Sequence, residues 1–141
     1  MRVNNVTGEE NIMKKIIVIM LILGMTALAS CSSNQSSIDK DAISGKTYIS
    51  EKEGVGGGEF YITLKPDQYY EYYEGNASTY TGFGVWTIED NLVVLDERSG
   101  YSLVFRFAVE GNALVYQRKG SSHFLMADVK DGDRFVLKKT E

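Results

Sequence analysis

The residues that most often carry acid–base or nucleophilic chemistry do not form a catalytic pattern in this sequence. His123 is the only histidine, and it directly follows Ser121 and Ser122. A serine nucleophile needs a histidine base that a third group orients, and one histidine beside two serines does not define such a triad. The sequence also contains neither G-x-S-x-G nor H-E-x-x-H. We therefore expect a non-catalytic protein in which His123 lies at a strand edge.

Two further segments have the composition of ligand-binding loops but lack the required pattern. Residues 54–58 are rich in glycine, yet no Lys-Ser/Thr pair and no predicted helix follow them, as a phosphate-binding loop requires. The acids Asp128, Asp131 and Asp133 lack the length and order of a calcium-binding loop, and Asp-Gly favours a hairpin turn. We expect no metal site and no cofactor.

Tyrosine is the one abundant residue type with recognition chemistry, at 9 in 141 residues. The candidate binding residues are Tyr69, Tyr70, Tyr72, Tyr73 and Tyr80. Because side chains alternate between the two faces of a strand, Tyr70 and Tyr72 are predicted to point inward. Tyr69 and Tyr73 are then predicted to point outward, with Tyr61 beside them. Exposed aromatic clusters are common in recognition surfaces, whereas cross-strand tyrosines can also simply stabilise a sheet.

The single cysteine, Cys31, ends a segment that is typical of export. Two lysines precede the apolar run from Ile16 to Ala29, which is shorter than the roughly 20 apolar residues that span a membrane. The run ends in Leu28-Ala29-Ser30-Cys31, an aliphatic and two small residues before cysteine, as in the lipobox of bacterial lipoproteins. We predict cleavage between Ser30 and Cys31 and transfer of a diacylglyceryl group to the thiol. Two acyl chains are enough for stable anchoring.

This signal divides the chain into three predicted parts. Residues 1–30 are the signal peptide, with Met13 as the true start, because Gly8-Glu9-Glu10 is the translation expected of a purine-rich ribosome-binding site. Residues 31–44 are the lipidated cysteine and a flexible serine-rich tether, and residues 45–141 are the folded domain. The lipid is expected to hold the domain at the outer face of the bacterial cytoplasmic membrane.

Short alternating runs of apolar and aromatic residues between turn residues predict an all-β domain without a helix. The predicted strands are residues 47–53, 60–64, 68–74, 79–89, 92–96, 101–109, 113–119, 123–129 and 134–138. Gly82 and Gly84 predict a bend or bulge in the fourth of them. The short connections imply an antiparallel up-and-down meander of eight or nine strands that closes into a small lipocalin-like barrel. A two-sheet β-sandwich is the alternative.

Several of these segments together resemble a known domain type. They are Gly45-Lys46-Thr47-Tyr48, GVGGGEFYITL, YYEYYEG, Gly84-Val85-Trp86-Thr87-Ile88 and GSSHFLMADVKDGDRF. The chain is similar over most of residues 45–136 to a lipocalin-like domain of small lipoproteins from Firmicutes, which is also appended to membrane sensor peptidases of the antibiotic-sensing type. This resemblance implies a fold and a location. It implies no protease activity, since the chain has no peptidase portion.

Two functions remain open at this point. The barrel is expected either to bind a small apolar or cell-wall-derived ligand in its mouth, or to present an aromatic face to a surface protein as an interaction or inhibitory module. A roomy cavity lined by Phe105, Phe107 and Trp86 would favour the small ligand, and a filled barrel with exposed tyrosines would favour the protein partner. The net charge of −4 without a basic stripe argues against nucleic acid, and we expect a monomer.

Overall fold

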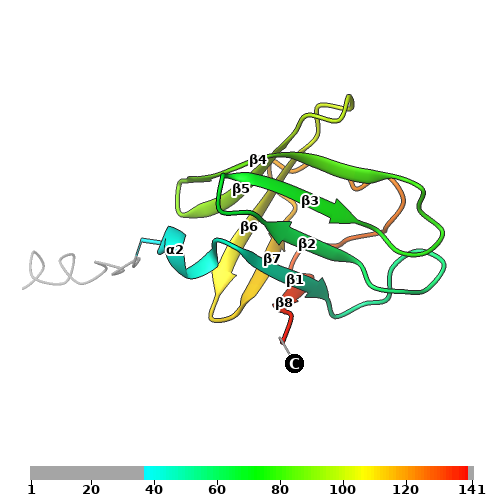
Figure 1. Cartoon of the computed structure of the whole chain (residues 1–141), viewed down its shortest axis with the longest axis horizontal. Helices are drawn as coiled ribbons and strands as arrows, with labels where there is room; N and C mark the ends of the chain where they lie inside the picture. The colour runs from blue at the N-terminus through cyan, green and yellow to red at the C-terminus, as the bar shows by residue number, and fades with distance from the viewer. Residues whose placement is uncertain (1–36, 140–141) are drawn as a thin grey trace, which may run out of the picture. The chain divides into compact units, whose positions relative to one another are not determined.

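Alternation of apolar and polar residues produces eight strands in the computed structural model, which describes residues 37–139 (Figure 1). The strands are β1 (Lys46–Ser50), β2 (Tyr61–Leu64), β3 (Tyr69–Tyr73), β4 (Thr81–Glu89), β5 (Leu92–Glu97), β6 (Val104–Glu110), β7 (Ala113–Gln117) and β8 (Arg134–Leu137). The predictions for the signal peptide, for Met13, and for Ser30 and Cys31 concern residues outside the described part. Within residues 37–139, no helix has the length and apolar character needed to cross a membrane.

The strands follow one another in sequence order around a closed antiparallel barrel. The barrel closes where β8 pairs with β1, with Leu137 opposite Tyr48 and Phe135 opposite Ser50. The two-residue turn between β4 and β5 has positive φ angles of 50° at Asp90 and 59° at Asn91, a geometry that suits the twist of a tight hairpin. The predicted all-β, up-and-down barrel is confirmed, and its closure rules out the two-sheet sandwich.

The expected absence of a helix is wrong at the end of the predicted tether. The short helix α2 (Lys40–Ile43) begins at Asp39, whose side chain accepts a hydrogen bond from the backbone N–H of Asp41 at 3.0 Å. Ile43 is buried in the core, and the ammonium group of Lys40 lies 5.5 Å from the centre of the Trp86 ring. The last residues of the predicted 31–44 tether therefore pack on one end of the barrel.

The predicted strand over residues 123–129 is also wrong. These residues belong to the long connection between β7 and β8, and His123 lies there in an exposed loop rather than at a strand edge. Phe124 is buried among the core aromatic rings, stacked on Phe105 at 4.0 Å between ring centroids. The side chain of Glu74 accepts hydrogen bonds from three successive N–H groups of this loop, at residues 125–127. Because these three N–H groups are bonded to Glu74, they cannot form the backbone hydrogen bonds of a β-strand.

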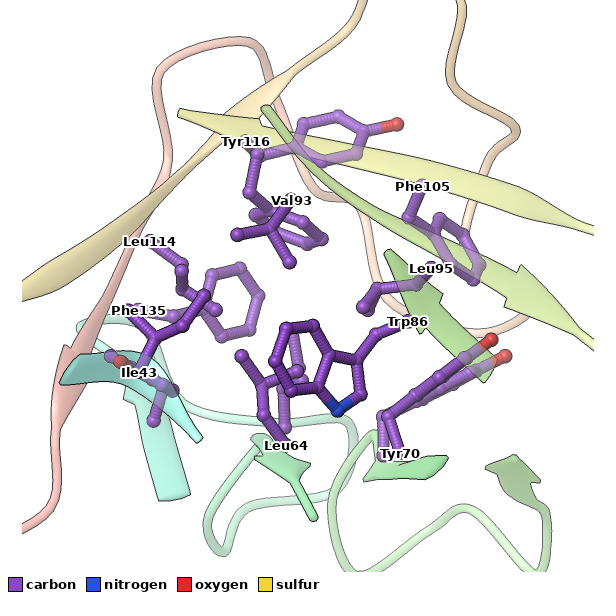
Figure 2. Close-up of a cluster of buried hydrophobic side chains, with 14 of the residues drawn as sticks. Ile43, Leu64, Tyr70, Trp86, Val93, Leu95, Phe105, Leu114, Tyr116 and Phe135 are labelled. Carbon is purple, nitrogen blue, oxygen red and sulfur yellow. The ribbon is translucent and has the colours of Figure 1, made fainter. Parts of the chain in front are cut away.

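Large side chains fill the interior of the barrel. Trp86, Phe105 and Phe107 each have 0% of their surface exposed. In Figure 2 the indole ring of Trp86 lies close to aliphatic side chains of other strands, Leu64 of β2 and Leu95 of β5 among them. The indole Nε1 of Trp86 donates to the carbonyl oxygen of Lys65 at 3.0 Å, so its single polar group is satisfied.

Gly82 and Gly84 serve this packing rather than the predicted bulge, because pairing from β3 through β4 to β5 runs without interruption. A Cβ atom on Gly82 would lie 2.0 Å from a ring carbon of Tyr72. A Cβ atom on Gly84 would lie 2.0 Å from the carbonyl oxygen of Asp96. The two glycines leave the inner surface of β4 free for the ring of Tyr72 and for the close approach of β5.

We expect Gly82→Ala to lower the free energy of unfolding by about 1–3 kcal/mol, because the added methyl group overpacks the core against Tyr72. Urea denaturation measures this change. Thr81→Ala is the control, since Thr81 is the exposed neighbour on the same strand. Equal stability of the two variants would contradict the packing role of Gly82.

Candidate functional site

The candidate tyrosines do not form one face; the barrel wall separates them into three locations. Tyr70 and Tyr72 point into the barrel and are 1% and 0% exposed, as the alternation predicts. Tyr69 and Tyr73 lie on the outer face of β3. Tyr80 lies before β4 at the rim, where its ring contacts Tyr72 at 6.1 Å between centroids. An outer surface and an inner cluster must therefore be considered separately.

The outer surface is an aromatic patch across β2, β3 and β4. The rings of Tyr61 and Tyr73 pair across β2 and β3, with centroids 5.8 Å apart, in the arrangement expected from the sequence. Tyr69 is 53% exposed and Phe83, on the same outer face, is 50% exposed. We call Tyr61, Tyr69, Tyr73 and Phe83 the outer aromatic row. Phe83 was not a predicted site residue, although its position between two inward glycines indicates an outward side chain.

Charged side chains accompany the outer aromatic row. Glu71 lies between Tyr69 and Tyr73 on the outer side of β3, directly opposite Phe83 in the register with β4. Its carboxylate forms an ion pair with Lys65 at 2.8 Å. The row therefore combines apolar ring surface with one balanced pair of charges.

The inner cluster is centred on Glu97, the last residue of β5. Glu97 is 3% exposed, and its Oε1 atom accepts a hydrogen bond from Ser99, whose hydroxyl also contacts that of Tyr80. Three atoms of this region are buried without a hydrogen-bond partner: Glu97 Oε2 and the hydroxyl oxygens of Tyr70 and Tyr72. We call Glu97, Ser99, Tyr70, Tyr72 and Tyr80 the Glu97 cluster.

The electrostatics of the Glu97 cluster follow from this burial. Burial, and to a smaller degree the charge of Glu74, raises the pKa of Glu97, even though hydrogen bonds from Ser99 and from the backbone of Leu103 act in the opposite direction. Burial, and to a smaller degree the charge of Glu97, raises the pKa of the Tyr70 and Tyr72 hydroxyls. Both tyrosines therefore keep their protons at neutral pH, and Glu97 is the ionisable group of the cluster.

A second buried acid provides a direct comparison with Glu97. Glu74 is 0% exposed, but its two carboxylate oxygens accept three backbone N–H groups at 3.2, 2.7 and 2.5 Å. Glu74 thus resembles an anion held in a backbone cradle and has a clear structural role. Among residues 37–139, no basic side chain forms an ion pair with Glu97.

The rim beside the Glu97 cluster is aromatic and partly open to solvent. The rings of Tyr80 and Tyr101 meet edge to face at 5.3 Å, and Tyr101 is 59% exposed in the loop between β5 and β6. Met126, in the loop that covers the same end of the barrel, is 52% exposed. The cluster therefore lies directly behind an exposed, mostly apolar surface.

The remaining residues considered from the sequence have structural contacts. His123 contacts the guanidinium group of Arg118 in an exposed loop. Asp131 accepts the backbone N–H of Arg118 at 2.7 Å, and Asp133 forms an ion pair with Lys52 at 2.7 Å. The glycine-rich segment 54–58 is bonded through its backbone to the connection between β3 and β4. Within the described part of the chain, no three His, Cys, Asp or Glu residues are grouped so as to hold a metal ion.

Comparisons of the chain with known protein families, with curated proteins and with solved structures found no match. The function must therefore be argued from the outer aromatic row and the Glu97 cluster themselves.

We expect Glu97 to make the folded protein less stable as the pH rises. Because burial raises its pKa in the folded state above the ordinary value of 4.5, the folded protein binds this proton more tightly than the unfolded chain. The stability from this proton is present below pH 4.5 and is lost as the pH rises through the folded pKa. Urea denaturation of wild type and Glu97→Gln between about pH 4 and pH 8 measures the effect.

In this comparison, the stability of wild type should decline more with pH than that of Glu97→Gln. Glu51→Gln, which removes an exposed carboxyl, should retain the pH dependence of wild type. If Glu97→Gln also retains the pH dependence of wild type, the carboxyl of Glu97 has the same pKa in the folded and the unfolded state, which would contradict the prediction.

Proposed function

We propose that this chain is a lipid-anchored, extracytoplasmic and non-catalytic module that recognises a surface protein through the outer aromatic row. The observation that carries the proposal is the location of the aromatic side chains. Trp86, Phe105 and Phe107 fill the interior, while Tyr69 and Phe83 are about half exposed on the outer wall. Trp86, Phe105 and Phe107 leave no space for an apolar ligand beside them, whereas the rings of Tyr69 and Phe83 are accessible to a partner on the outer wall.

The chemistry of the outer aromatic row suits protein recognition. Tyrosine and phenylalanine bury a large area at low cost in side-chain entropy, which is why aromatic residues are enriched in the central parts of interfaces. The cross-strand contact between Tyr61 and Tyr73 helps to hold their two rings in place before binding. The ion pair of Lys65 and Glu71 supplies polar groups that orient the partner.

The location in this proposal comes from the sequence at Cys31. A thiol that carries two acyl chains holds the domain at the membrane, and the residues between Cys31 and α2 set the distance over which the domain can reach a partner. A domain restricted to one surface meets its partners at a raised effective concentration, so moderate affinity is sufficient. A role at the membrane surface therefore requires neither a large interface nor a catalytic group.

A photo-crosslinking amino acid at position 83 should give a covalent adduct with a protein in intact cells. The same amino acid at position 112, an exposed turn residue outside the row, should give none. In the position-83 protein, Tyr69→Ser should reduce the adduct several-fold, because it removes half-exposed ring surface from the same face. Mass spectrometry of the adducts identifies the partner, and equal adducts at both positions would contradict the proposal.

The protein isolated from membranes should have the mass of residues 31–141 plus the acyl groups on Cys31. Cys31→Ser should remain unprocessed and should lack this added mass, because the thiol accepts the lipid. Intact-protein mass spectrometry distinguishes the two forms. In cells with the signal peptidase inhibited, the precursor should begin at Met13, and an unmodified mature N-terminus would contradict the anchoring.

A further inference from the structure

The Glu97 cluster contains three buried oxygen atoms that nothing within residues 37–139 satisfies: Glu97 Oε2, Tyr70 Oη and Tyr72 Oη. The residues that carry them are 3%, 1% and 0% exposed. An unsatisfied buried polar group destabilises the fold, and an unpaired buried charge destabilises it more. Two of these groups lie on β3 and one on β5, on either side of β4, and together they point to a site that is completed by another molecule.

The strand register places the residues that carry these oxygens at neighbouring positions of the barrel wall. Tyr70 lies opposite Gly84 in the pairing of β3 with β4, and Gly84 lies opposite Glu97 in the pairing of β4 with β5. Gly84 has no side chain, which lets the backbone of β5 at Asp96 and Glu97 approach β4 closely. Glu97 is near enough for its charge to raise the pKa of the Tyr70 hydroxyl. The Tyr72 ring lies parallel to that of Tyr70, with an angle of 10° and 6.3 Å between centroids, over the second glycine, Gly82.

The charge of the cluster defines what is missing. Both buried carboxylates of the described residues, Glu74 and Glu97, lie at this end of the barrel. Glu74 is satisfied by three N–H groups. Glu97 is stabilised by the Ser99 hydroxyl and by the backbone of Leu103, but it has no basic partner within residues 37–139 and its Oε2 atom has no hydrogen-bond partner. The cluster therefore lacks a positive charge that carries hydrogen-bond donors.

We propose that the Glu97 cluster binds the primary ammonium group of a small amine. Such a group has three N–H donors and one positive charge, which match the three unpartnered oxygens and the single carboxylate. A water molecule has two donors and leaves the charge uncompensated. Magnesium and calcium ions take about six or more oxygen ligands, whereas the cluster has three unpartnered oxygens.

The aromatic surroundings fit the same ligand. Tyr72 packs edge to face against Phe105 at 5.5 Å and Phe124 at 5.3 Å, so rings border the cluster on several sides. Ring faces attract cations, and desolvation strengthens this attraction. The organic part of the amine lies toward the rim, against Tyr80 and the exposed ring of Tyr101.

The loop between β5 and β6 is bonded to the cluster through Ser99, which contacts both Glu97 and Tyr80. Because Glu97, Tyr70 and Tyr72 are at most 3% exposed, the amine reaches them only when part of this end of the barrel moves outward. This site is separate from the outer aromatic row, so the proposal does not depend on the protein partner proposed above.

Isothermal titration of the full-length gene product, purified in non-ionic detergent, tests the site with n-butylammonium chloride. We expect saturable binding of one amine per chain, and at least about tenfold weaker binding of butyltrimethylammonium, which has the same charge but no N–H donor. Butan-1-ol, which has no charge, should not bind. Equal affinity for the trimethyl compound or for butan-1-ol would overturn the proposal, as would absence of saturable binding of the amine.

Two variants separate the site from general effects on the protein. Glu97→Gln keeps the shape of the side chain and removes the charge, and Tyr70→Phe with Tyr72→Phe removes two oxygens and keeps both rings. Each should weaken amine binding at least about tenfold, whereas Glu51→Gln and Tyr69→Phe should not change it. Near-UV circular dichroism verifies that each variant is folded. Unchanged binding in folded Glu97→Gln would overturn the proposal.

An excess of potassium chloride distinguishes an ammonium site from an alkali-metal site. Potassium ions carry the same charge as the amine but donate no hydrogen bond, so they should not compete for the site. The loss of amine binding in potassium chloride should therefore equal the loss in tetramethylammonium chloride at the same concentration, which measures the effect of ionic strength alone. Displacement by potassium alone would assign the three oxygens to a metal cation and overturn the amine proposal. The crosslinking at position 83 would be unaffected by either result.

Discussion

The structure depends on the small interior of an eight-stranded barrel, in which a large side chain on one strand requires a small one on its neighbour. The ring of Tyr72 on β3 occupies the space that Gly82 leaves on β4, and the backbone of β5 approaches β4 closely at Gly84. Had β4 carried ordinary side chains at these two positions, neither the Tyr72 ring nor β5 could lie where it does. The same packing brings the Glu97 carboxylate of β5 within the electrostatic reach of the tyrosine hydroxyls. One packing constraint thus shapes both the core and the candidate site.

Much of this arrangement could be predicted because strands of a closed barrel have a strict two-residue period. That period placed Tyr70 and Tyr72 inside and Tyr69 and Tyr73 outside. The same two-residue period also indicates that Glu97 points inward, although Glu97 was not a predicted site residue. Glu97 continues the inward series that begins with Val93 and Leu95, and it is buried as they are. A buried acid in an otherwise apolar series is an informative feature for a candidate site.

The misjudged segments are those whose structure depends on distant residues. The loop around Phe124 has alternating apolar residues, yet Glu74 binds three of its N–H groups across a separation of 51–53 residues. Likewise, α2 is a single turn whose place is set by burial of Ile43 and by the hydrogen bond from Ile38 to Asn91 at 3.2 Å. Local propensity does not encode such contacts, so neither segment could be placed from its own sequence.

The pairing of β1 with β8 has a consequence for the order of folding. Tyr48 and Leu137 are paired, so the first strand of the barrel can be completed only after the last strand has been synthesised. Until then β1 presents an unpaired edge, which is the kind of surface that joins strands of other chains. Loops that must close over almost the whole domain also fold slowly. The domain is thus vulnerable to aggregation until β8 has emerged, and a truncation that removes β8 would make that vulnerable state permanent.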